Sequence, residues 1–236
     1  MRALFYAVAG VAFVSTAAYA DDHSQSCGIP AGTVSALQAK LASVVTLADH
    51  NGGLFSPNMM WSAVVDRRGV LCSVIKSGDA WPGSRAIAIA KAETANDFSN
   101  VKLALSTANL YGPTQPGGSL YGLNNSNPFN PFFNRISQSS GDGTGVGENP
   151  GGIITFGGGV ALYAGGQVIG GLGVSGDTSC ADHAIAFRMR RLAGLDGTPG
   201  GAGADNIQYY PAGTTITTLD PTQFAQPHCS AGDITP

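Results

Sequence analysis

The sequence predicts one α+β domain in which helices flank an antiparallel sheet of four to five strands. Two tight-turn signals, at residues 66–69 and at Gly165-Gly166, each separate a pair of apolar, strand-like runs. Segments with helical spacing of apolar residues precede the first pair and follow both pairs. Because a tight turn joins neighbouring antiparallel strands, this order favours an antiparallel sheet covered by helices.

The expected domain begins with a helix and then a hairpin, which ends at residue 75. Residues 33–50 carry apolar side chains at helical spacing and end at the stop signal Asn51-Gly52. Residues 59–65 and 70–75 are apolar and strand-like, and the turn between them has Gly69 at its last position. These two strands are expected to pair.

The middle of the chain changes from helix to irregular loop. Residues 84–98 predict a helix whose repeated alanines allow close packing on the sheet, and a second short helix is expected at 101–110. Prolines among Asn, Ser and Gly then indicate a loop insertion at 112–150, from which a short fifth strand could be recruited. Three aromatic residues in this polar loop either anchor it or form a lid over an apolar ligand: Phe129, Phe132 and Phe133.

Residues 151–186 are the most informative stretch, and they read as strand, hairpin, strand, glycine turn and helix. Gly165-Gly166 supplies the positive φ angles that a two-residue turn needs. The second strand ends at Gly176, and the next residues offer three candidate caps for the following helix: Asp177, Thr178 and Ser179. After the domain ends near residue 195, residues 196–236 are expected to be an extension strapped onto the domain.

The N-terminus has the pattern of a signal peptide over residues 1–20. Arg2 gives a positive start, an apolar segment follows, and Ala18-Tyr19-Ala20 fits a cleavage site. A membrane anchor is the alternative, but the apolar run is shorter than the roughly 20 residues that span a bilayer. The protein is therefore expected to be exported, either periplasmic or secreted, with no membrane span after cleavage.

The charge balance excludes one class of partner. The chain of 236 residues has a net charge of −3, and only 11% of its residues are charged. Loss of Arg2 with the signal peptide makes the charge more negative still. Without a basic patch, nucleic-acid binding is not expected. The 34 glycines at low charge indicate tight, ordered loops rather than a disordered chain.

Four cysteines lie in the expected mature chain, and an even number in an oxidising compartment favours two disulfides. Three pairings are possible. We favour Cys27–Cys72 and Cys180–Cys229, in which each terminal cysteine ties a tail to the core. A metal site is the alternative, but the spacing contains no CxxC pair.

Four segments of the chain carry a family pattern: Val64-Val65-Asp66 with Gly69, Lys91-Ala-Glu-Thr-Ala within 84–98, Gly157-Gly158-Gly159-Val160, and 170–176 with Asp182. Through these segments, residues 33–195 resemble the GlcG/HbpS family of haem-associated proteins, and in particular a secreted subgroup with extra cysteines. The resemblance implies a profilin-like three-layer sandwich, assembly into homo-oligomers, and haem or tetrapyrrole as ligand and cofactor. The chain departs from short members of this family by its cysteines, its 112–150 insertion and its tail.

The glycine turn before the helix at 179 is the candidate binding site. Backbone N–H groups at a helix start can bind haem propionates or another small anion, although a side-chain cap alone also explains such a turn. His183 is a candidate haem-iron ligand, or a structural residue that bonds to the tail. The candidate binding residues are Gly173, Ser175, Gly176, Thr178, Ser179, His183 and Tyr111.

Two other functions stay open at this stage. A small redox or lyase-type enzyme would use Arg85 to hold a carboxylate and His183 as acid and base. An oligomeric scaffold without a small ligand would use the aromatic loop as its interface. No dedicated metal motif, nucleophile elbow, Walker loop or Rossmann fingerprint is present in the sequence.

Overall fold

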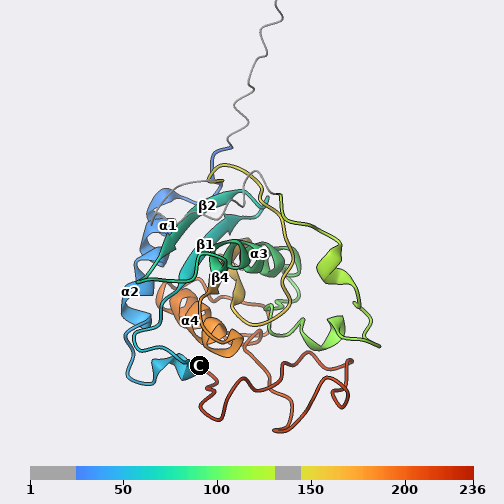
Figure 1. The fold of residues 1–236 in the computed structure, drawn as a ribbon. Helices are drawn as coiled ribbons and strands as arrows, with labels where there is room; N and C mark the ends of the chain where they lie inside the picture. The colour runs from blue at the N-terminus through green and yellow to red at the C-terminus, as the bar shows by residue number, and fades with distance from the viewer. Residues whose placement is uncertain (1–24, 131–144) are drawn as a thin grey trace, which may run out of the picture.

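The computed structural model describes residues 25–130 and 145–236, and its centre is one antiparallel sheet with the strand order β2-β1-β4-β3 (Figure 1). β1 (Trp61–Asp66) and β2 (Leu71–Lys76) form the first hairpin, and β3 (Gly159–Ala164) and β4 (Gln167–Ser175) form the second. β1 pairs with β4, which joins the two hairpins at the centre of the sheet. The α+β class is confirmed, with four strands in the described residues.

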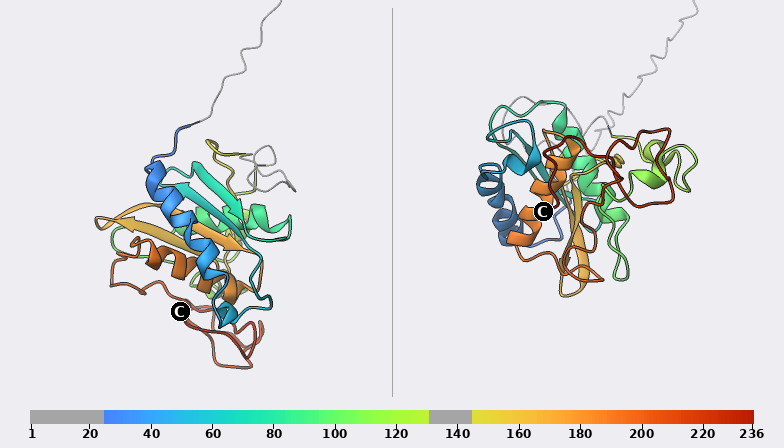
Figure 2. Two further views of the ribbon diagram at one scale, coloured as in Figure 1. Left: turned by 90° about the vertical axis from the view of Figure 1, so that its left-hand side faces the viewer. Right: turned by 90° about the horizontal axis from the view of Figure 1, so that it is seen from below.

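Helices cover both faces of this sheet, so the domain has three layers (Figure 2). α3 (Ser84–Asp97) lies on one face. α1 (Ala31–Gln38), α2 (Lys40–Val44) and α4 (Ser179–Leu192) lie on the other. β1 contributes to both sides, because alternate side chains of a strand point to opposite faces. Its Val64 packs with the α1, α2 and α4 side, and its Ala63 and Val65 pack with α3.

The backbone of α3 lies almost directly on the glycines of β4. A Cβ at Gly173 would lie 1.9 Å from the carbonyl oxygen of Ala88, and one at Gly171 would lie 2.1 Å from that of Ala92. Only glycine permits this approach. The alanine repeat and the glycine-rich strand are therefore two sides of one tight contact, as the alanines of α3 predicted.

The second hairpin turn is confirmed, whereas two helix predictions need correction. Gly165 and Gly166 have φ angles of 57° and 74°. The helix expected over 33–50 breaks into α1 and α2 at Ala39, and the 3-10 helix η1 (His50–Gly52) follows.

The helix expected at 101–110 is wrong, because polar side chains hold the backbone in turns there. Asn100 Oδ1 accepts hydrogen bonds from the N–H groups of Lys102 and Leu103. Asn109 Oδ1 accepts hydrogen bonds from both the N–H and the hydroxyl of Ser106. Such local bonds offer the backbone an alternative to the helix.

The 112–150 insertion contains two short 3-10 helices, η2 (Gly112–Thr114) and η3 (Leu123–Asn125), and no strand in its described part. The Phe129 ring packs directly on Gly152, since a Cβ added at Gly152 would lie only 2.7 Å from the ring. This contact holds the loop to the domain. Phe132 and Phe133 lie outside the described residues. The lid and the scaffold interface expected from them stay predictions.

The C-terminal extension, residues 196–236, runs along the α4 side of the domain (Figure 1). A buried ion pair, Arg190 with Asp205 at 2.5 Å, fixes its first part to α4. The disulfide Cys180–Cys229 fixes its last part, and the second disulfide, Cys27–Cys72, joins the segment before α1 to β2. These are the two pairs favoured from the sequence.

The expected signal peptide, residues 1–20, lies outside the described residues. In the part of the chain that is described, no helix combines the length and the apolar character that crossing a membrane requires.

Candidate functional site

The β4–α4 corner, defined as residues 173–183, is already occupied by the protein's own carboxylate. Asp182 Oδ1 accepts hydrogen bonds from the N–H groups of Gly176 (3.1 Å) and Asp177 (3.0 Å). These are two of the N–H groups that the sequence offered to a propionate or another anion. The turn therefore does bind a carboxylate, but the carboxylate belongs to Asp182.

The other oxygen of Asp182 forms a buried ion pair with α3. Lys91 Nζ lies 2.6 Å from Asp182 Oδ2, and both side chains are almost completely buried. Lys91 Nζ also donates to the carbonyl of Val174 and lies 4.7 Å from the centre of the Phe156 ring. Burial raises the pKa of Asp182 to about 6 and lowers the pKa of Lys91. The pair thus links α3, β4 and α4 at some cost in desolvation.

The remaining polar groups of the corner are used within the fold. The Thr178 hydroxyl caps α4 by accepting from the N–H of Ala181. The Asp177 carboxylate accepts from the N–H groups of Leu54 and Phe55. Ser179 Oγ accepts a hydrogen bond from the side chain of Gln226, in the C-terminal extension. Ser175 is buried, and Gly173 lies against α3.

His183 lies inside the core beneath the extension, with its side chain fully buried. Its Nε2 lies 3.1 Å from Asn206 Oδ1 and 3.1 Å from the backbone N of Ile207. Its Nδ1 has no hydrogen-bond partner among the described residues. Burial lowers the pKa of His183 to about 4, so the imidazole is neutral at pH 7. In this conformation no open face of the ring is available to an iron atom.

The other candidates are separated from this corner. Arg85 is 1% exposed at the start of α3. Tyr111 packs with the extension residues Tyr210, Leu219 and Ala225. Neither Arg85 nor His183 lines any of five surface pockets formed by the described residues. None of these pockets therefore brings the two side chains together, as the enzyme hypothesis requires.

An open concavity lies elsewhere, between α1 and the edge strand β2, and we call it the α1–β2 groove. Its main part has a volume of about 640 Å³. A second part of about 430 Å³ shares three lining residues with the first, so the two parts adjoin. The lining residues are Cys27, Gly28, Ile29, Pro30, Ala31, Val34, Ser35, Gln38, Cys72, Ser73 and Ile75, with Ala39, Leu41, Ala42, Lys76 and Ser77 in the second part.

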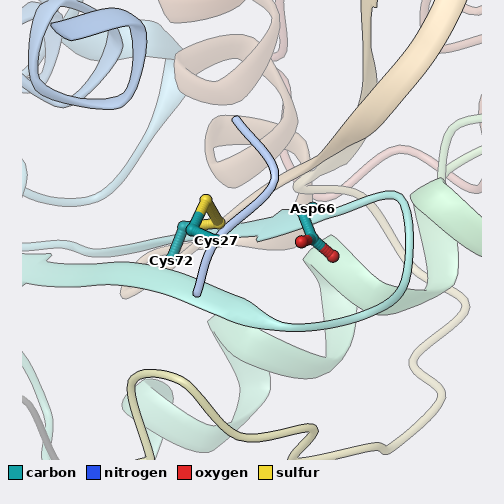
Figure 3. Close-up of side chains that lie close together, drawn as sticks. All are labelled: Cys27, Asp66 and Cys72. Carbon is teal, nitrogen blue, oxygen red and sulfur yellow. A yellow bond between two sulfur atoms is a disulfide. The ribbon is translucent and has the colours of Figure 1, made fainter. Parts of the chain in front are cut away.

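The Cys27–Cys72 disulfide forms one wall of this groove, and Asp66 lies beside it (Figure 3). Asp66 accepts hydrogen bonds from the N–H groups of Gly28 and Val70 and pairs with Arg68. Burial alone would raise the pKa of Asp66, but these bonds outweigh it and lower the pKa. The sulfurs and the carboxylate are close enough to hold a metal ion, yet the disulfide and these bonds already use them.

Little in the sequence indicates the groove. Its α1 wall begins at Ala31, two residues before the helix expected from periodicity, and its floor depends on how α1 lies over β2. The available signal was the polar Ser73 and Lys76 in β2, an edge strand in which only Leu71 and Val74 are buried.

The family model described as haem degrading protein HbpS-like matches residues 57–190, from the start of β1 to α4. No curated protein sequence matches the chain.

Among solved structures, three illustrate the likeness. The Klebsiella pneumoniae protein ORFY is 24% identical over 69% of this chain and 85% of that chain, with a TM-score of 0.45. A PduOC:haem complex is 25% identical over 70% and 94%, with a TM-score of 0.49. HbpS is 21% identical over 68% and 85%, with a TM-score of 0.42. Since the family model covers more than half of the chain, the protein belongs to the HbpS-like family of haem degrading proteins.

Proposed function

We propose that the protein binds haem or a closely related tetrapyrrole and acts as an exported carrier, scavenger or sensor. The observation that carries this proposal is the family match over residues 57–190, which includes all four strands together with α3. Haem is flat, largely apolar and carries two carboxylates, so its site should combine apolar walls with a few polar groups.

The α1–β2 groove is the place where we expect the macrocycle to bind. Its main part falls within the roughly 300–1,000 Å³ of small-molecule sites. Val34 and Ile75 line it from the two walls. The β4–α4 corner is a poorer candidate in this conformation, because Asp182 fills it.

The groove and the corner predict different spectra. The described lining of the groove holds none of the His, Tyr, Met or free Cys side chains that usually ligate haem iron. Haem held there would bind through its macrocycle and propionates, and its Soret band would not depend on His183. Haem held at the corner would lose its protein ligand in a His183→Ala variant.

A pair of tryptophan variants on α1 tests the groove directly. Ser35 and Ala36 are both exposed on this helix, but only Ser35 lines the groove. We expect Ser35→Trp to weaken haemin affinity about tenfold or more, equal to at least about 1.4 kcal/mol, by filling the site. Ala36→Trp should leave the affinity unchanged.

The measurement is a haemin titration of the oxidised protein followed at the Soret band. Equal affinity of both tryptophan variants and the unchanged protein would exclude the groove. Absence of any saturable band would exclude haem binding itself.

Export and self-association complete the proposal. Two disulfides suit an oxidising compartment, and residues 1–20 have a cleavable pattern. N-terminal sequencing of the protein that cells export when they express the full-length chain would show whether cleavage follows Ala20. Exposed apolar side chains such as Leu54 and Trp81 favour a homo-oligomer, which light scattering of the mature protein would test.

A further inference from the structure

The two disulfides of this protein have different surroundings. Cys229 is exposed, and its partner Cys180 is 2% exposed in the first turn of α4. Cys27 and Cys72 are both half-buried, beside β2. An external thiolate must reach a sulfur to attack it. Cys229 is the exposed member of its disulfide, whereas the other disulfide has no exposed cysteine, so attack should favour Cys229.

Hydrogen-bond donors surround the Cys180–Cys229 sulfurs. Cys229 Sγ accepts from the backbone N–H of Cys180 at 3.2 Å and lies 3.3 Å from Ser179 Oγ. The Gln226 amide donates to Cys180 Sγ at 3.3 Å. Donors that point at a sulfur stabilise it as a thiolate, and the start of α4 adds a favourable dipole. At the other disulfide, the N–H of Ile29 is the one backbone donor to Cys27 among the described residues.

Asp233 opposes these donors. One of its oxygens lies within 4.8 Å of both Cys180 and Cys229 sulfurs. This carboxylate accepts hydrogen bonds from the N–H groups of Cys229 and Ser230, which spreads its charge over the loop. His228 Nδ1 lies 3.3 Å from it.

Beyond Cys229, a chain of contacts leads to His183. The carbonyl of Pro236 accepts a hydrogen bond from the Asn206 side chain at 2.8 Å, and Asn206 Oδ1 is the contact of His183 Nε2. Tyr209 helps to hold the same segment, since its hydroxyl donates to Ile234 O and its ring stacks on His228. The disulfide is the one covalent attachment of residues 227–236 to α4 in the described structure.

We propose that Cys180–Cys229 is a thiol–disulfide exchange site whose reduction by a dithiol releases residues 227–236 and uncovers Asn206 and His183. One thiolate of the dithiol attacks Cys229 Sγ, the Cys180–Cys229 bond breaks, and Cys180 leaves as a thiolate beside Gln226. The second thiolate then attacks the mixed disulfide and releases Cys229. Two electrons pass to the protein, and the dithiol becomes a disulfide.

This inference goes beyond haem binding and does not depend on it. It assigns the C-terminal extension the role of a cover that a reductant can open. Its Asp205 anchor on Arg190 is buried and independent of the disulfide, so residues up to about 205 should remain in place.

The first test is partial reduction of the oxidised protein with limiting dithiothreitol, followed by alkylation and peptide mass spectrometry. We expect Cys180 and Cys229 to be alkylated on the order of tenfold faster than Cys27 and Cys72, because exchange rates depend on access and on the leaving thiolate. Equal rates, or faster alkylation of Cys27 and Cys72, would overturn the proposal.

The second test follows the cover by hydrogen exchange in two matched double variants. In Cys180→Ser/Cys229→Ser, the amides of residues 206–210 and 226–236 should lose protection, including the N–H of Ile207 that faces His183. Cys27→Ser/Cys72→Ser should leave these amides protected. Unchanged protection in the first variant would show that the disulfide does not hold the cover.

A variant that fails to fold would obscure this comparison, so the same exchange measurement is made on unmodified protein after selective reduction. Loss of protection confined to the two segments supports the cover, and either no loss or loss over the whole chain overturns it. A failure of haemin binding would leave all of these readouts intact, so the two proposals can fail separately.

Discussion

The α1–β2 groove and the β4–α4 corner divide between them the properties expected of a binding site. The groove is open and apolar in part, but its described lining offers no usual iron ligand. The corner has a histidine, a helix start and several N–H donors, but the fold uses them itself. Polar residues that look functional in sequence are thus structural here, and the accessible space lies where the sequence is unremarkable.

The groove and the corner differ because a buried ion pair lies at the corner. Lys91 and Asp182 are 91 positions apart, yet they meet in the core and satisfy the helix start. A buried charge needs a partner, so once Lys91 lies inside the domain a carboxylate must be near it. In the groove, by contrast, no buried charge among the described lining residues demands an internal partner. The following predictions test how firmly the corner is closed.

The largest expected effect comes from breaking the ion pair that closes the corner. Asp182→Ala leaves Lys91 buried without its partner and frees the N–H groups of Gly176 and Asp177. Removing one member of a buried pair costs about 3–5 kcal/mol in the free energy of unfolding. Chemical denaturation at pH 7 measures this loss.

The matched control is the exposed pair of Asp49 with Arg188, in which the Asp49 side chain is 44% exposed. Asp49→Ala should cost about 1 kcal/mol or less, as exposed pairs do. If Asp182→Ala and Asp49→Ala lost the same free energy of unfolding, the buried pair at the corner would contribute no more than an exposed pair, which would contradict the closed corner.

The second prediction uses the titration of His183. Burial holds its pKa at about 4, whereas an unfolded histidine has a pKa near 6.5. The unfolded chain therefore binds a proton that the folded chain excludes, and stability present above pH 6.5 is lost as the pH falls toward 4. The expected loss from this residue is roughly 2–3 kcal/mol between pH 7 and pH 4.5.

His183→Gln removes this titration and keeps a polar side chain near Asn206. Unfolding free energies of both proteins at pH 7 and pH 4.5 give the comparison, and the variant should lose less on acidification. Equal losses would mean that His183 is accessible to protons in the folded state, and the corner would then be open.

Local signals in the sequence were sufficient for most of the fold. Gly165-Gly166 indicated the second hairpin because two positive φ angles at adjacent positions suit few other residues. The alanines of α3 indicated close packing on the sheet. The prediction failed at 101–110, where Asn100 and Asn109 side chains compete with helical hydrogen bonds. Apolar spacing alone does not reveal that competition.

The site was harder to predict, because its decisive contacts are long-range. The sequence located the turn before α4 and offered Thr178 as one of three candidate caps, but it did not indicate that Asp182 binds back to the turn. It placed His183 on α4 and offered a bond to the tail as its structural role, which the contact with Asn206 provides, but it did not indicate which tail residue makes that contact. Such contacts depend on the packing of distant segments, which periodicity and spacing do not report.

The smallest expected change in stability concerns Gly173, a candidate ligand contact in the sequence that packs against α3 in the structure. Gly173→Ala places a methyl group 1.9 Å from the Ala88 carbonyl, so α3 must move and stability should fall by about 1–3 kcal/mol. Gly32→Ala, at an open position of α1, should raise stability by up to about 1 kcal/mol. Thermal unfolding and haemin affinity are measured on both. If Gly173→Ala weakened haemin binding at unchanged stability, Gly173 would be a ligand contact, and the corner rather than the groove would be the site.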